Sequence, residues 1–96
     1  MTITGVVSSL SDRQRLICLL ASVGELDKRI AILLDISLRT VELEKQRISS
    51  SLGIPTPRLV IWAVENRRVL QADVNWFGVL DSIRRLIAPY GLSEWG

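Results

Sequence analysis

Hydrophobic residues recur at helical spacing in several separate stretches of this chain. The first stretch follows Ser11, and its apolar positions are Leu16, Ile17, Leu20 and Val23. Gln14 stands three residues after Ser11, which is the spacing of a capping box at a helix N-terminus. The pattern predicts a helix over residues 11–22 that ends at Gly24.

Two further helices are predicted on either side of a tight turn. The first covers residues 28–34, with Asp27 as its N-cap. Asp35 lies in the turn, where an Asp tolerates left-handed backbone better than most residues. Ser37 then caps a longer helix over about 38–52, closed by Gly53. A short helix, a turn and a longer helix form a helix-turn-helix, a unit that places its second helix in the DNA major groove.

The helix over 38–52 separates apolar from polar positions. Val41, Ile48 and Leu52 fall on one face at spacings of seven and four. The other face carries polar residues at spacings of three and four, which are Arg39, Glu42, Gln46 and Ser49. The apolar face is expected to pack on the domain and the polar face to point outward.

The remaining sequence also predicts helices. Thr56-Pro57 is the N-cap and first residue of a fourth helix that reaches about Asn66, with four packed residues, Leu59, Val60, Ala63 and Val64. Another helix is expected after residue 73, with its apolar stripe formed by Trp76, Leu80, Ile83 and Ile87. Because no stretch shows strand alternation, the fold is predicted to be all-α. We divide it into a flexible lead (1–9), a helix-turn-helix domain (10–68) and a C-terminal helical extension (69–96).

Composition narrows the class of protein. The 96 residues are enough for one small domain, and 48% of them are hydrophobic, which favours a partner that covers some apolar surface. Because no apolar run approaches the ~20 residues of a membrane span, we expect no membrane insertion. The N-terminus does not resemble a signal peptide, and the one cysteine, Cys18, cannot form an internal disulfide. We therefore expect a cytoplasmic protein.

Catalytic chemistry has little support in this sequence. The chain has no histidine and one cysteine, and it has no glycine-rich phosphate loop. We therefore predict no enzyme activity, no catalytic residue, no metal site and no cofactor. Charge is unevenly placed: residues 10–68 carry ten Lys/Arg against seven Asp/Glu, whereas residues 69–96 carry two against three. This mild basic bias favours DNA as the partner of the first part.

Residues 10–65 resemble the DNA-binding domain of LuxR/FixJ/GerE-type bacterial transcription regulators. The resemblance lies in an ordered set of short motifs, Leu10-Ser11-Asp12-Arg13-Gln14, Gly24, Lys28-x-Ile30-Ala31, Leu34-x-Ile36-Ser37-x-Arg39-Thr40-Val41-Glu42, Leu52-Gly53-Ile54 and Arg58-Leu59. It implies a four-helix domain, here with an additional C-terminal helix, that binds double-stranded DNA in a sequence-specific manner and regulates transcription. It also implies that positions 39, 40, 42, 45 and 46 face DNA, and that the fourth helix contacts a second copy.

Chemical roles for these positions follow from side-chain type. Arg39, Lys45 and Arg47 can neutralise phosphates, and an arginine can also read guanine. Glu42 can accept from cytosine and Gln46 can pair with adenine. Four residues are assigned to the DNA backbone, namely Lys28, Thr40, Arg47 and Arg58. The alternative is a solvated helix face on which Glu42 pairs with Gln46 or Arg39.

Glu44 departs from the family, which often has histidine there. A second carboxylate near phosphates repels them unless it turns away or pairs with Arg47 or Arg39. This departure favours an alternative function, a degenerate helix-turn-helix that acts as a protein-interaction module without binding DNA. The family usually carries a receiver or sensing domain as well, so the chain is either a stand-alone regulator or a fragment.

Two regions are candidate interfaces with other proteins. Trp62 is a candidate anchor of a homodimer, because interfaces favour tryptophan, but it could equally pack within the chain. The extension over 69–96 could bind a protein partner or form a dimer arm. Alternatively, it packs onto the first and fourth helices.

Overall fold

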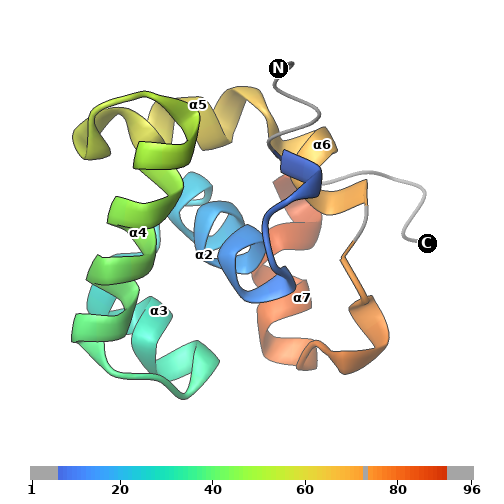
Figure 1. Cartoon of the computed structure of the whole chain (residues 1–96). Coiled ribbons are helices and arrows are strands. Elements are labelled where there is room, and N and C mark those ends of the chain that lie inside the picture. Colours follow the sequence, from blue (N-terminus) through green and yellow to red (C-terminus); the bar gives the residue numbers. More distant parts are fainter. Residues whose placement is uncertain (1–6, 73, 91–96) are drawn as a thin grey trace.

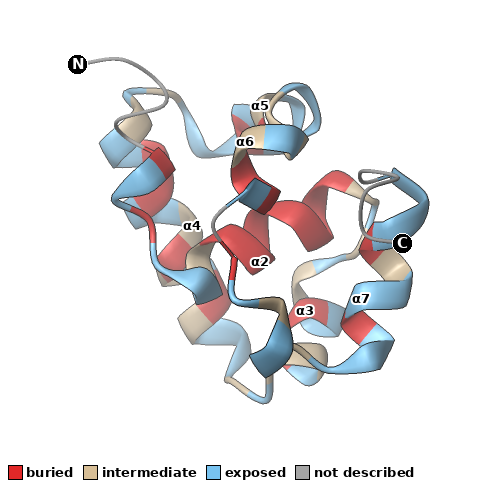
Figure 2. Cartoon of the chain, turned by 90° about the vertical axis from the view of Figure 1, so that its right-hand side faces the viewer, coloured by how far each residue is buried: buried red, intermediate tan, exposed pale blue. Residues whose placement is uncertain are grey.

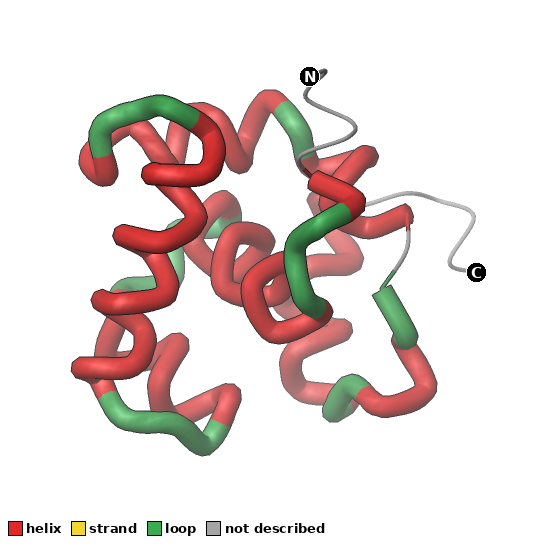
Figure 3. The backbone as a smooth tube through the Cα atoms, in the orientation of Figure 1, coloured by secondary structure: helices red, strands yellow, loops and turns green. Residues whose placement is uncertain are grey.

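The computed structural model describes residues 7–72 and 74–90, and these form a set of helices joined by short loops (Figures 1 and 3). The α-helices are α2 (Asp12–Ser22), α3 (Asp27–Leu34), α4 (Leu38–Leu52), α5 (Leu59–Glu65), α6 (Arg67–Ala72) and α7 (Asp81–Ile87). Three single-turn 3-10 helices link or follow them, which are η1 (Thr56–Arg58), η2 (Trp76–Gly78) and η3 (Ala88–Tyr90). Because these residues include no strand, the predicted all-α class is confirmed.

Helix α2 is the central helix, with α4 on one side and α7 on the other (Figure 1). The predicted capping box is present, since the Ser11 hydroxyl accepts from the Gln14 backbone N–H and the Gln14 side chain accepts from Ser11. Every residue from Arg15 to Ser22 is buried, as the red ribbon in Figure 2 shows. A helix enclosed around its whole circumference forms the middle of the hydrophobic core.

Helices α3 and α4 flank the turn that the sequence predicts. Asp35 has left-handed backbone, at φ 55° and ψ 48°. The Ser37 hydroxyl caps α4 by accepting from the Thr40 N–H at 3.0 Å, and Gly53 ends the helix at φ 71°. The prediction of Asp27 as an N-cap is wrong, because Leu26 holds that position without a side-chain bond and Asp27 begins the helix. The Asp27 carboxylate instead pairs with Lys45.

The predicted fourth helix is divided into η1 and α5. Thr56 does not cap it, because Pro55 precedes η1 and makes no side-chain bond. Leu59 and Ala63 are buried as expected, but Val60 and Val64 are 41% and 42% exposed. The helix ends at Glu65 because Asn66 leaves helical backbone, and its side-chain N–H donates to the Trp62 carbonyl oxygen at 2.8 Å.

The C-terminal extension differs from the single helix that was predicted. Helix α6 was not anticipated, and the expected helix is interrupted by η2. Leu80, which was predicted to pack, is 63% exposed, whereas Ile83 and Ile87 on α7 are buried. Ile83 and Ile87 share one core with Leu70 and with the helix-turn-helix. The extension therefore packs within the chain; its residues 91–96 lie outside the described part.

Two arginine side chains connect α2 to the first and last described segments of the chain. Arg67 at the start of α6 donates to the Ser22 hydroxyl at 3.1 Å and to the Ser22 carbonyl oxygen, and it lies over the Tyr90 ring. Arg15 donates to the Val7 carbonyl oxygen at 3.0 Å, and Val7 is buried. The end of the expected flexible lead thus packs on the core, and residues 1–6 lie outside the described part. In the described part of the chain, none of the helices has the length and apolar character of a membrane span.

Candidate nucleic-acid interface

The outward side of α4 is a ridge of polar side chains. We call this the α4 ridge, and it consists of four exposed residues, Arg39, Glu42, Gln46 and Ser50. Val41 and Ile48 on the opposite side are fully buried, so the predicted separation of faces holds for them. Ser49 is a correction, because it is 2% exposed rather than on the outward face. It lies one helical turn after Lys45, whose side chain is also largely buried, so the two share the same side of α4.

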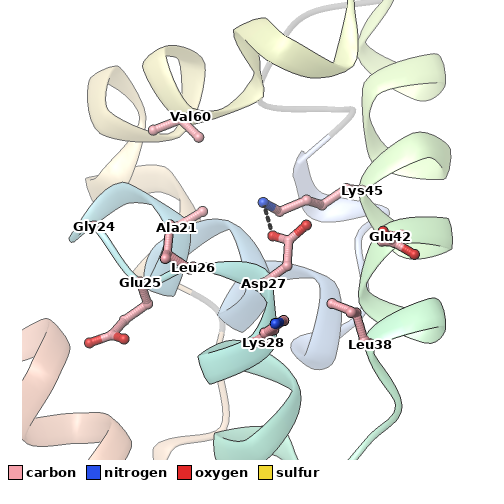
Figure 4. A pocket seen from close by; sticks show the side chains of 10 residues that line it. All are labelled: Ala21, Gly24, Glu25, Leu26, Asp27, Lys28, Leu38, Glu42, Lys45 and Val60. Carbon is pink, nitrogen blue, oxygen red and sulfur yellow. Dashed lines mark ion pairs between the residues drawn. The ribbon is translucent and has the colours of Figure 1, made fainter.

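Lys45 does not point outward with the ridge. Its ammonium group forms an ion pair with the Asp27 carboxylate at the start of α3, and its side chain is 14% exposed. Figure 4 shows this pair within a groove between α3, α4 and α5. The groove has a volume of about 620 Å³, and its apolar wall includes Leu26, Leu38 and Val60. Lys45, which was predicted to contact DNA, is therefore already paired with a carboxylate of the same chain.

Glu44 is likewise turned away from the ridge. Its side chain is 6% exposed and accepts from the Arg47 guanidinium at 2.8 Å. The Arg13 guanidinium at the start of α2 lies 4.0 Å from the other carboxylate oxygen. Arg47 is one of the two residues predicted to pair with Glu44, whereas the other, Arg39, does not pair with it. Arg13 was missed, because its approach depends on how α2 packs against α4 and no spacing in the sequence reveals it.

The other predicted DNA contacts lie on two surfaces, and all of them except Arg58 belong to α3 or α4. Lys28 at the start of α3 lines the groove together with Glu42. Arg39 and Gln46 line a second hollow of about 230 Å³, which Glu42 also borders. Thr40 is partly buried, and its hydroxyl lies 2.8 Å from the Ser37 hydroxyl.

Arg58 belongs to a different surface. It lines a hollow of about 240 Å³ beside Trp62, together with Ile54, Ile61, Glu65 and Asn66. Trp62 is partly buried and packs against the core, while Ile61 next to it is 59% exposed. The structure thus separates Arg58 from the α4 ridge and brings it to the outer side of α5.

The Cys18 thiol is buried in the core, away from these surfaces. Burial raises the pKa of the Cys18 thiol to about 12, although the nearby Lys45 ammonium acts in the opposite direction. A thiol with such a pKa is a poor nucleophile. Among residues 7–72 and 74–90, no three His, Cys, Asp or Glu side chains gather as a metal site.

Comparisons of the chain with protein-family models, with curated proteins and with solved structures give no match. What the molecule can bind is therefore inferred from its own geometry. That geometry offers hydrogen-bonding side chains on the outside of a capped 15-residue helix.

Proposed function

We propose that this chain is a bacterial, cytoplasmic transcription regulator that binds double-stranded DNA as a homodimer, with α4 in the major groove. The observation that carries the proposal is the α4 ridge. Arg39, Glu42 and Gln46 are exposed and form no ion pair or side-chain hydrogen bond within the described part of the chain. Their donors and acceptors are therefore available to base edges, and a capped helix of this kind fits the major groove.

The α4 ridge supports distinct roles for its members. Arg39 contacts guanine or a phosphate, Gln46 pairs with adenine, and Glu42 accepts from a cytosine amino group. Lys28 and Thr40 contact the DNA backbone beside the groove. Arg47 retains free N–H groups, because its side chain is 68% exposed while Glu44 holds one end. Glu44 itself does not oppose phosphates, since it is buried and paired.

Fluorescence anisotropy with a mixed-sequence duplex, titrated across salt, tests the proposal. Binding should weaken linearly on a log–log plot, and Arg39→Ala should lower the slope by about 0.9, the contribution of one phosphate contact. The matched control is Arg85→Ala, which removes the same charge from an exposed position on α7. Equal effects of the two variants would show that binding follows total charge and not the α4 ridge.

One observation favours the second candidate, a protein-interaction module without DNA binding. Asp27 and Glu44 pair with Lys45 and Arg47, so two cations assigned to DNA are compensated inside the chain. A pull-down from nuclease-treated extract tests this function. Recovery of no stoichiometric protein partner would count against it, while absence of duplex binding at low salt would count against the first.

A further inference from the structure

We propose that copies of this chain associate head to tail, with Phe77 of one copy in the groove between α3, α4 and α5 of the next. The inference does not rest on the proposed DNA contacts. Two surfaces of the molecule carry it. One is the groove, and the other is a projection that we call the η2 tip, formed by Phe77 on η2 and by Leu80 directly before α7.

The η2 tip presents an aromatic ring to water. Phe77 is 103% exposed and Leu80 is 63% exposed. Trp76 beside them packs against the core, and its indole N–H donates to the Gln71 carbonyl oxygen at 3.3 Å. The turn is therefore anchored through Trp76 while Phe77 points outward. An apolar group that is held in place in this way loses little conformational freedom when it binds.

The groove provides an apolar wall that can receive such a group. Leu26, Val60 and Leu38 line it and are 78%, 41% and 36% exposed. Figure 4 shows Val60 and Leu38 on opposite sides of the groove. Its volume is about 620 Å³. Because pockets of about 300–1,000 Å³ accept drug-sized ligands, the groove is large enough for both side chains of the η2 tip. Their burial there would remove apolar area from water, which is the main source of association free energy.

The charges around the two surfaces are opposite in sign. Three carboxylates and two ammonium groups line the groove and leave one net negative charge; they belong to Glu25, Asp27, Glu42, Lys28 and Lys45. Beside the η2 tip, Arg84 and Arg85 follow Asp81 at spacings of three and four, so this side of α7 carries one net positive charge. Arg85 is exposed and forms no ion pair within the described part of the chain. This complementarity favours a second copy as the occupant of the groove.

The positions of the two surfaces dictate a head-to-tail contact. In Figure 1, α3 and α4 lie to the left of α2, whereas the orange segment that contains η2 lies at the right-hand edge beyond α7. The η2 tip of a copy therefore cannot enter its own groove. A two-fold interface uses one patch on both copies, and that patch would have to contain both surfaces. Each bound copy thus leaves one groove and one η2 tip free for further copies. Because Lys28 and Glu42 line the groove, a copy seated there also covers two residues that are proposed to contact DNA.

Sedimentation velocity of the full chain without DNA tests the contact. The mass of the unmodified chain should rise with concentration past two copies. Phe77→Ala should weaken this association about tenfold or more, because it removes the aromatic anchor. Leu26→Asn should weaken it similarly from the groove side, and asparagine suits the N-cap position that Leu26 holds, so α3 should remain folded. Ile32→Ala is the matched control, since Ile32 is 70% exposed on α3 and does not line the groove. Circular dichroism checks that each variant is folded.

A mixture of the two variants gives the sharper result. Phe77→Ala keeps the groove and Leu26→Asn keeps the η2 tip, so together they should form a complex that neither forms alone. An unmodified chain that never exceeds two copies would overturn the inference. Normal association of Leu26→Asn would also overturn it, because the η2 tips would then contact each other and not the groove. A mixture no more associated than its components would do the same. Because no DNA is present, failure to associate and failure to bind a duplex are separate results.

Discussion

The Lys45 ammonium group on α4 pairs with the carboxylate of Asp27, the first residue of α3. This contact joins the two helices of the helix-turn-helix away from the turn between them. The Lys45 side chain is 14% exposed and that of Asp27 is 33% exposed, so water screens the pair only in part. The pair links the two helices, and it keeps the Lys45 ammonium group from the proposed DNA surface.

Asp27→Asn should therefore tighten binding to duplex DNA. The substitution releases Lys45, which then adds about one phosphate contact, so the salt slope should rise by about 0.9. The measurement is the anisotropy titration across salt. Lys45→Ala in the Asp27→Asn background should abolish the gain, while Lys45→Ala alone should change binding little. If Lys45→Ala alone weakens binding as much as Arg39→Ala does, Lys45 already contacts DNA in the unmodified chain.

The buried carboxylate of Glu44 should contribute to stability. Glu44→Gln keeps the shape but loses charge-assisted bonds to Arg47 and Arg13, so we expect a loss of about 1–2 kcal/mol in the free energy of unfolding. This figure is below that for a fully buried pair, because both arginines are about half exposed or more. Urea unfolding gives the value. Glu42→Gln on the same helix is the control. If it lowers the free energy of unfolding as much as Glu44→Gln does, the stabilising role assigned to the Glu44 carboxylate is wrong.

The C-terminal extension should unfold together with the helix-turn-helix. Ile87 on α7 is fully buried in the shared core, and Ile87→Ala should cost about 2–5 kcal/mol in the free energy of unfolding. Leu80→Ala, at a residue that is 63% exposed, should cost much less. Near- and far-ultraviolet circular dichroism should show one coincident transition for Ile87→Ala. Two separated transitions would mean that the extension is an independent unit.

Cys18 should be unreactive until the chain unfolds. Burial raises the pKa of its thiol from 9.0 to about 12, so a thiol reagent at pH 8 should modify it only in denaturant. Because the unfolded chain loses this proton first, stability should fall as the pH rises from about 9 toward 12. Cys18→Ala should show a shallower loss over that window. Parallel pH profiles for both chains would contradict the raised pKa.

The sequence predicted the caps of α2 and α4 and the turn between α3 and α4 well, because these signals are local. Ser11, Ser37 and Gly53 act on backbone within one helical turn, and the structure places all three as caps. The same holds for the left-handed Asp35. These contacts depend on residues three or four positions apart, so spacing alone reveals them.

The extension and much of the site could not be predicted, because they depend on contacts between distant segments. Asp27 has the residue type of an N-cap, but packing of α3 against α4 gives its carboxylate to Lys45. Glu44 is similar, since the packing of α4 against α2 brings its carboxylate to 4.0 Å from the Arg13 guanidinium. In the extension, Leu80 and Ile83 are both large aliphatic residues, but Leu80 precedes α7 and is exposed, whereas Ile83 lies within α7 and is buried.

Helix α2 is enclosed by α4 on one side and by α6 and α7 on the other, and Arg67 holds its last residue, Ser22. A chain cut at residue 68 would keep that arginine but leave one side of the central helix in water. A bound molecule that displaced α7 would also affect the packing of α4, because only α2, a helix about 10 Å thick, lies between them. The shortest piece that folds with the α4 ridge in place is therefore expected to extend at least to Ile87.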